Sequence, residues 1–450
     1  MGAARVRRAR RRRPRRRRLH GRRRRERLRR LAGGRAGRRA VALGPARPGH
    51  RRPARQPRGA APVAAVTDRV RLAVAGLGAV AQSVHLPLIA RRWDLFDLVA
   101  VCDLAPSLRT AIGEQYAVPA EHRYADAGTM IEQSGADGVV LLTSGSHGDV
   151  ALRALRAGVS VFCEKPLTYT VAEADALAAA ERDLGRPALL LAYMKEHDEA
   201  VWQLRERLEG IDDVRTVEIE VLHPTGASQL AFANLRPAPH DVDTDALSRL
   251  AADSSQLLDT ALGAGTSPRL RELYANVVLG SIVHDTSLLR AVFGGLTTVD
   301  GARVWPDGAD EGAWTARSVE VTGELPGAVR ARMSWHYLPA YPAYTETLTV
   351  HHGRGTLKVT FGTPYVLNNP TRLEVVEAPP AGTAAGGEVR SVFTSTGESF
   401  ENELADFHRM VTEGHAPRAG IAEGRADIVT SQRIIRLLAG EPVGGEAATA

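Results

Sequence analysis

Short apolar runs alternate with longer mixed segments along residues 70–192. The runs hold almost no polar position, so we expect both faces to be buried, as in the central strands of a parallel sheet. The segments between them space their apolar residues as one face of a helix does. We therefore predict a right-handed, doubly wound parallel sheet, with strands over residues 71–75, 98–102, 123–124, 138–142, 159–163 and 188–192 and helices over residues 107–115, 127–133, 147–158 and 170–185.

After about residue 192 apolar and polar positions alternate singly. This pattern predicts half-exposed strands of an open, mostly antiparallel sheet that is covered on one face. Helical spacing returns over residues 245–292, 400–411 and 421–438. The predicted fold class is α/β for residues 67–190 and α+β for residues 191–440, with strands of the second part over residues 217–221, 319–321, 329–333, 348–350 and 357–359.

The first 66 residues differ from the rest in charge. They hold 26 of the 59 Lys and Arg residues and one of the 51 Asp and Glu residues, a net charge of +25, so the remaining chain carries −17. A segment of Arg, Ala, Gly and Pro has little to bury and is expected to be disordered alone. Three interpretations stay open: an over-extended gene start with translation beginning near Val66 or Val70, a solvated tail, and an arm for nucleic acid or another anionic surface.

Two cysteines, Cys102 and Cys163, end predicted strands that are three strand spacings apart in a 3-2-1-4-5 order, about 14 Å. A disulfide cannot span that distance, so we expect two buried thiols in a reducing compartment. No apolar run has the roughly 20 residues that span a bilayer, and the Arg-rich start lacks the apolar region of a secretory signal. We expect a cytoplasmic protein with no membrane partner.

A glycine-rich turn joins the first strand to the first helix. The stretch Gly76-Leu77-Gly78-Ala79-Val80-Ala81 has the form G-x-G-x-x-A. In such a turn the first glycine permits the tight bend, the second lets backbone approach a pyrophosphate, and the helix N-terminus adds partial positive charge. Asp103 ends the next strand, where its carboxylate can accept hydrogen bonds from the adenosine ribose. The turn therefore predicts a dinucleotide-binding domain of the Rossmann type.

The same carboxylate predicts NAD rather than NADP. Asp103 would repel a 2′-phosphate, and no basic residue directly follows it. Arg109 is expected to lie too far along the next helix to compensate. The other candidate cofactor contacts also lie at the turn or at carboxyl ends of strands, where open α/β sheets bind ligands; the full set is Gly76, Gly78, Ala79, Val80, Asp103, Thr143, Ser144, His147, Glu164 and Lys165. No Cys, His and carboxylate set has the spacing of a metal site.

Taken in order, the glycine turn, His85-Leu86-Pro87, Asp103, Glu164-Lys165-Pro166 and His284-Asp285 resemble the glucose-fructose oxidoreductase / inositol dehydrogenase family (Gfo/Idh/MocA). The resemblance covers about residues 68–440. It implies a Rossmann domain, an open-sheet domain whose outer face forms a homo-oligomer interface, and C-terminal helices that return to the nucleotide domain. It also implies a cis bond between Lys165 and Pro166.

The resemblance assigns roles to single residues. Lys165 matches the catalytic lysine of the family, His284 its catalytic histidine and His147 a polar position near the cofactor. Lys195 and Asp285 are candidates for substrate contact. One position departs, because family enzymes often have Asp four residues before the histidine, where this chain has Gly280. Asp285 does not replace it, since the next residue along a helix points about 100° away.

The predicted function is hydride transfer between NAD and a carbinol of a sugar, inositol or related polyol. Such chemistry needs a base for the hydroxyl proton and a positive group beside the oxygen, and Lys165 and His284 supply both types. Two alternatives stay open. In the first, which Gly280 favours, the chain would be a non-catalytic cofactor-binding regulator. In the second, it would be an enzyme that uses NAD transiently in a redox-neutral sugar conversion.

Overall fold

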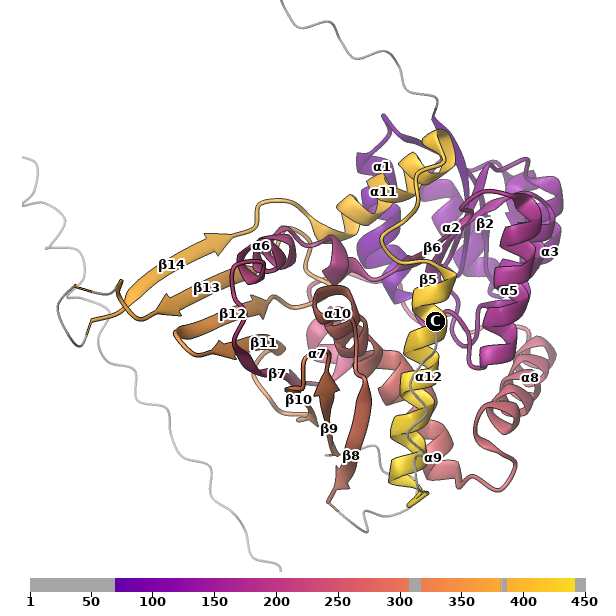
Figure 1. Cartoon of the computed structure of the whole chain (residues 1–450). Coiled ribbons are helices and arrows are strands. Elements are labelled where there is room, and N and C mark those ends of the chain that lie inside the picture. The colour runs from indigo at the N-terminus through magenta and orange to yellow at the C-terminus, as the bar shows by residue number, and fades with distance from the viewer. Residues whose placement is uncertain (1–68, 307–316, 381, 383–386, 442–450) are drawn as a thin grey trace, which may run out of the picture. The chain divides into compact units, whose positions relative to one another are not determined.

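The computed structural model describes residues 69–306, 317–380, 382 and 387–441, and the interpretations of the Arg-rich start lie outside these residues. All the described residues belong to one compact unit, Ala64–Ala450. This unit contains two sheets, which lie side by side with α12 running along both (Figure 1). No helix in the described part has both the length and the apolar composition needed to cross a bilayer.

The first sheet has six parallel strands in the order β3-β2-β1-β4-β5-β6. This order confirms the predicted doubly wound sheet. Cys102 at the end of β2 and Cys163 near the end of β5 are separated by β1 and β4, and both are buried free thiols as predicted. The strands are β1 (Val70–Ala75), β2 (Phe96–Cys102), β3 (Arg123–Tyr124), β4 (Gly138–Leu141), β5 (Ser160–Glu164) and β6 (Leu189–Ala192).

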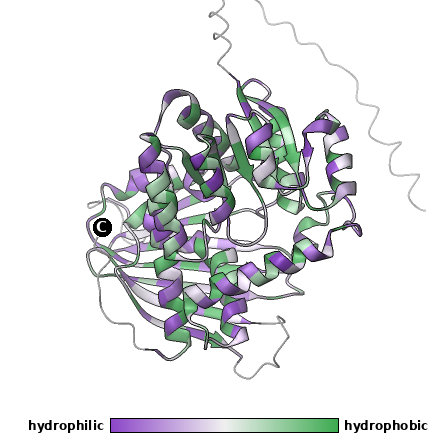
Figure 2. Cartoon of the chain, turned by 90° about the vertical axis from the view of Figure 1, so that its right-hand side faces the viewer, coloured by the Kyte–Doolittle hydropathy of each residue, from purple (hydrophilic) through white to green (hydrophobic). Residues whose placement is uncertain are grey.

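Both faces of this sheet are covered, which explains why its strands are apolar throughout. Along β1, Leu72 and Val74 enter one hydrophobic core, whereas Ala73 and Ala75 enter the core on the opposite face. The strands are mostly green in Figure 2, whereas the surrounding helices mix green with purple. The helices are π-helix η1 (Ala81–His85), α1 (Leu86–Arg91), α2 (Pro106–Gln115), the 3₁₀ turn η2 (Ala120–His122), α3 (Ala127–Gln133), α4 (Gly148–Arg156) and α5 (Val171–Leu184).

The second sheet has eight strands in the order β14-β13-β12-β11-β7-β10-β9-β8. Only β7 and β10 pair in parallel, so the sheet is mostly antiparallel as predicted. On β7 the apolar positions Val217 and Ile219 are buried, while Glu218 faces the other side and pairs with Arg332 at 3.2 Å. The strands are β7 (Val214–His223), β8 (Thr298–Trp305), β9 (Ser318–Leu325), β10 (Val329–Tyr337), β11 (Thr345–His352), β12 (Gly355–Phe361), β13 (Arg372–Glu377) and β14 (Val389–Thr394).

The remaining helices cover the inner face of the second sheet and connect it to the first. On α11, Phe407 meets Phe162 of β5 edge-to-face, with ring centroids 5.7 Å apart. Arg290 of α10 binds Asp427 of α12 at 3.0 Å. These contacts join the C-terminal helices to both sheets. The elements are η3 (Met194–His197), α6 (Glu199–Leu208), α7 (Gly226–Leu230), α8 (Thr244–Leu262), α9 (Pro268–Glu272), π-helix η4 (Leu273–Ile282), α10 (Val283–Phe293), α11 (Ser399–Glu413) and α12 (Ile421–Leu438).

Candidate active site

The turn after β1 has a backbone that requires glycine at its first position. Gly76 has a φ of +91°, and a Cβ there would lie 2.7 Å from the carbonyl carbon of Leu142, at the end of β4. By contrast, a Cβ on Gly78 would meet nothing within 4 Å. The turn is therefore tight on the side of the sheet and open on the other side, and this open side has the room that a pyrophosphate needs.

Asp103 is held against this turn. Its carboxylate accepts hydrogen bonds from the backbone N–H groups of Leu77 and Ala105, both at 2.9 Å. A carboxylate has about four acceptor sites, so it can still accept hydrogen bonds from ribose hydroxyls. The prediction for Arg109 was wrong, because this side chain folds back and its Nη1 donates to the carbonyl oxygen of Asp103. A guanidinium thus lies next to the expected ribose position.

Lys165 follows the last residue of β5. Its peptide bond to Pro166 is cis, as the resemblance implied. The ammonium group donates a hydrogen bond to the carbonyl oxygen of Gly280 in η4, with Nζ and O 2.6 Å apart. Burial lowers the pKa of Lys165 below its usual 10.5, Glu164 opposes that change, and the charge of Lys195 adds to it. The lysine bridges the first sheet and the helices over the second sheet.

His284 lies in the first turn of α10. Burial lowers the pKa of its imidazole well below 6.5, and the charges of Lys165 and Lys195 lower it further. The imidazole is therefore neutral at neutral pH. Among the described residues, Nδ1 has no hydrogen-bond partner. The ring meets the edge of Tyr193, with centroids 6.2 Å apart.

Lys165 and His284 line a common cavity of about 450 Å³. Val80, Thr143 and Ser144 line the side next to the glycine turn. The second sheet and the chain beyond β12 supply an aromatic wall, made of His223, Trp335, Tyr337, Tyr344 and Tyr365. The cavity thus extends from the glycine turn of the first sheet to the aromatic wall, with the two candidate catalytic side chains on its surface.

The sequence of the first domain matches a known family. Residues 70–191 match the profile described as an oxidoreductase family with an NAD-binding Rossmann fold. That profile is the one of the Gfo/Idh/MocA family, and the first domain is similar to it. Relatives include inositol 2-dehydrogenase of Salmonella typhimurium, 30% identical over 142 residues. A putative UDP-kanosamine synthase oxidoreductase subunit of Amycolatopsis mediterranei is 36% identical over 157 residues.

These matches cover 31% and 35% of this chain, and the chain spans only 42% of the length of each of these relatives. Solved structures share the fold over a longer stretch. Aldose-aldose oxidoreductase from Caulobacter crescentus aligns with a TM-score of 0.61 at 20% identity, covering 83% of this chain and 98% of that one. A 3-ketoreductase mutant from Actinomadura kijaniata, in complex with TDP-benzene and NADP, aligns at 0.60 and 16% identity, covering 83% and 98%.

Gly280 stands where enzymes of the Gfo/Idh/MocA family often have Asp, and the structure shows what surrounds it. A Cβ at this position would come no closer than 3.6 Å to its nearest neighbour, the carbonyl oxygen of Ala275. That is ordinary van der Waals contact, so the backbone leaves room for a side chain. The carbonyl of Gly280, rather than a side chain, provides the contact to Lys165.

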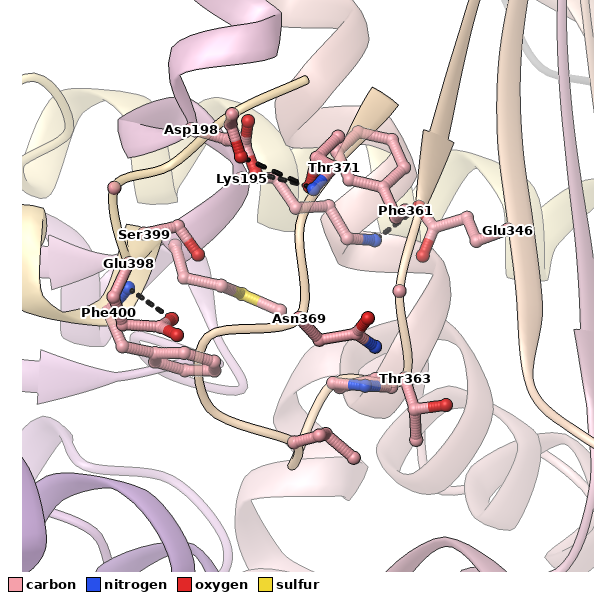
Figure 3. A pocket seen from close by; sticks show the side chains of 16 residues that line it. Lys195, Asp198, Glu346, Phe361, Thr363, Asn369, Thr371, Glu398, Ser399 and Phe400 are labelled. Atoms are coloured by element: carbon pink, nitrogen blue, oxygen red, sulfur yellow. Dashed lines mark hydrogen bonds and ion pairs between the residues drawn. The ribbon is translucent and has the colours of Figure 1, made fainter. Parts of the chain in front are cut away.

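Lys195 and Asp285 were both predicted to contact substrate, and the structure separates them. Lys195 lines the cavity and binds Glu346, with Asp285 Oδ1 3.9 Å from its ammonium group. Figure 3, which draws a neighbouring pocket, shows the pair of Lys195 and Glu346. Asp285 is only 2% exposed and is not among the lining residues, so its side chain does not reach the cavity. Burial and the neighbouring Glu346 raise the pKa of Asp285 well above its usual value. Glu346, rather than Asp285, is the hydrogen-bond partner that holds Lys195 in place.

His147, predicted as a polar position near the cofactor, lies behind the cavity surface. Its side chain is buried, with Nδ1 2.7 Å from the carbonyl oxygen of Pro166 and Nε2 2.9 Å from that of Thr143. It is not among the residues that line the cavity. The ring connects the turns that follow β4 and β5, and the neighbouring Thr143 and Ser144 face the cavity in its place.

The structure adds one pair that the sequence did not predict. His85 in η1 is fully buried, and its Nε2 lies 2.9 Å from Glu164 Oε1. Glu164 Oε2 in turn accepts the backbone N–H of Lys165 at 3.1 Å. Burial alone would raise the pKa of Glu164, but His85 and Lys165 together lower it. The pair fixes the backbone from which the lysine projects. Its only sequence signal was the His85-Leu86-Pro87 motif.

Proposed function

We propose that this chain is an NAD-dependent oxidoreductase that transfers a hydride between the nicotinamide and a carbinol of a sugar, inositol or related polyol. The observation that carries the proposal is the shared cavity, which brings Lys165 and His284 together beside the glycine turn. The names of relatives, which include inositol 2-dehydrogenases, support the substrate class.

The residues around the glycine turn fit the cofactor. The open space at Gly78 would hold the pyrophosphate, Asp103 would accept hydrogen bonds from the ribose, and Thr143 and Ser144 would lie beside the nicotinamide end. Bound NAD supplies the hydride acceptor. The chain's own residues then have to bind the alcohol, orient it and remove its proton.

Lys165 and His284 divide that task. The ammonium group of Lys165 would donate a hydrogen bond to the substrate oxygen and stabilise the negative charge that develops on it. His284 is held neutral by burial, so its imidazole is ready to accept the hydroxyl proton during oxidation. In the reverse direction the protonated imidazole returns a proton to the carbonyl oxygen.

The aromatic wall favours a ring-shaped polyol. Trp335 and Tyr337 are stacked, with planes 10° apart and centroids 6.2 Å apart, and His223 packs against both. The C–H face of a pyranose or cyclitol ring packs favourably on such aromatic surfaces. Burial lowers the pKa of His223, so it adds no positive charge at neutral pH. The wall would therefore bind an uncharged ring.

Gln229 of α7 offers a specific contact to that ring. The side chain is 4% exposed and lines the cavity, and its Oε1 has no partner among the described residues. Its Nε2 lies 3.4 Å from the carbonyl oxygen of Pro224, which can only accept, so the amide orientation is fixed. We expect Oε1 to accept a hydrogen bond from a non-reacting substrate hydroxyl.

Gln229→Leu should therefore lower kcat/KM by about tenfold, mainly through KM, because one buried hydrogen bond to a non-reacting group is lost. Steady-state kinetics with the substrate and with its monodeoxy analogues would measure this. The analogue that lacks the hydroxyl bound by Gln229 should have the same kcat/KM with the unaltered enzyme and with Gln229→Leu. Gln203→Leu on α6 is the control, since that side chain binds Glu206 instead. An unchanged KM in Gln229→Leu would contradict the assignment.

The proposed function is tested with a panel of sugars, inositols and other polyols, each with NAD and with NADP. Formation of the reduced nicotinamide is followed by its absorbance. We expect at least one cyclic polyol to be oxidised with NAD. If nucleotide binds tightly but no member of the panel reacts in either direction, the regulator interpretation replaces this one.

A further inference from the structure

A segment of the second domain extends to the nucleotide-binding edge of the first sheet. Residues 224–243, here called the strap, connect β7 to α8. The backbone N–H of Arg236 donates to Gln82 in η1 at 3.0 Å, and its Nη2 donates to Gln115 at the end of α2 at 2.9 Å. Val242 packs against one hydrophobic core of the first sheet. The strap therefore contacts the helices that begin after the glycine turn and after Asp103.

Asp241 makes the strap's contact nearest to the expected ribose site. Its Oδ2 accepts the backbone N–H of Ser107, and its Oδ1 accepts the Ser107 hydroxyl, both at 2.7 Å. Ser107 lies in the first turn of the ten-residue helix α2, four residues after Asp103. A carboxylate from a distant part of the chain therefore binds the helix N-terminus that follows the ribose-binding residue.

The charges at this position bear on the choice of nucleotide. The hydrogen bonds from Ser107 hold the pKa of Asp241 below its usual value, so it is ionised at neutral pH. Arg109 lies close enough to interact with Asp241 and binds the carbonyl of Asp103. Asp103 and Asp241 thus place two carboxylates around the start of α2, where Arg109 is the nearby guanidinium, whereas Arg236 is held at the other end of α2.

We propose that Asp241 is a specificity-determining residue that excludes a 2′-phosphate and so selects NAD over NADP. With Asp103 alone, Arg109 would balance the local charge and a phosphate could be accepted. With Asp241 added, a phosphate dianion meets a net negative surface and finds Ser107 already occupied, while an uncharged 2′-hydroxyl meets neither obstacle. The inference rests on the proposed function, because it assumes that a nicotinamide nucleotide binds at this edge.

Asp241→Asn is the sharpest variant, because asparagine has the same shape and can keep both contacts to Ser107 without the charge. The full chain is titrated with NAD and, separately, with NADP. NADP affinity should rise by about 5- to 20-fold and NAD affinity should change less than about twofold. The gain should shrink as salt is raised from about 0.05 to about 0.5 M, because exposed charges are screened.

The matched control is Asp245→Asn, which removes an exposed carboxylate from the first turn of α8. It should leave both affinities unchanged. The proposal that Asp241 determines specificity would be overturned if Asp241→Asn left the ratio of NADP to NAD affinity unaltered. An equal loss of affinity for both nucleotides would overturn it as well, even if NAD binds. If the unaltered chain binds neither nucleotide, the proposed function fails as well, and the two failures are thereby distinguished.

Discussion

Replacing Lys165 by alanine should lower kcat by about 10³- to 10⁴-fold and leave NAD affinity within a few fold. The ammonium group of Lys165 has no direct carboxylate contact among the described residues, since its hydrogen bond goes to the Gly280 carbonyl, whereas Lys195 is bound to Glu346. Without it, negative charge develops on the substrate oxygen with no partner. Pyrophosphate and ribose would be held elsewhere, so binding should persist. Steady-state kinetics and nucleotide titration measure the two quantities.

Lys358→Ala provides the matched control. Lys358 is an exposed residue of β12, and its replacement should change neither quantity. A Lys165→Ala enzyme that turns over a confirmed substrate at the unaltered rate would show that the lysine is not catalytic.

Replacing His284 by alanine should cost about 10²- to 10⁴-fold in kcat, the usual range for one acid–base group. Its effect on the pH profile is more specific. Burial lowers the pKa of His284 well below 6.5, so the neutral base persists as pH falls, and oxidation is lost only below that usual value. Burial also lowers the pKa of Lys165, so the alkaline loss should begin below 10.5. His284→Ala should lose the acid limb and keep the alkaline one.

His351→Ala is the control for this variant. That ring bonds Thr356 within the β11–β12 hairpin and does not line the cavity. If His284→Ala keeps the acid limb, another group is the base.

Gly280→Asp tests the opposite change, the addition of a carboxylate near His284, whose Nδ1 has no hydrogen-bond partner among the described residues. The backbone there has room for a side chain, and a carboxylate beside His284 and Lys165 would favour their charged forms. We expect the acid limb to move to higher pH. A limb that does not move would mean that the new carboxylate fails to reach the ring.

The sequence predicted the helices and strands whose burial or ends leave a pattern of apolar or capping residues. β1 is apolar because both of its faces are covered, and α5 begins at the Thr170–Glu173 capping box and ends at Gly185 with a φ of +68°. It did not predict β8, β13 or β14. The two outermost strands, β8 and β14, leave many side chains exposed and so carry little apolar alternation, and β13 is short. The π-helices also carry no signal in the apolar spacing.

For the site, the sequence identified side chains at strand ends but not what they contact. Lys165 could be placed at the end of β5 because strand ends of a parallel sheet share one edge. Its contact with Gly280 joins residues 115 positions apart, and that of Lys195 with Glu346 joins residues 151 apart. Such contacts depend on how the two sheets pack. For the same reason the contacts of His147 and the position of Asp241 were not predicted.

The central claim is that this cavity performs direct hydride transfer. The most direct test is to incubate the full chain and NAD with polyols and sugars that carry deuterium on their carbinol carbons, myo-inositol first. Mass spectrometry of the nucleotide then follows the label. The proposal predicts deuterium in the reduced nicotinamide with the unaltered chain and little or none with Lys165→Ala. Tight NAD binding with no deuterium in the nucleotide, for any compound of the panel, would contradict it.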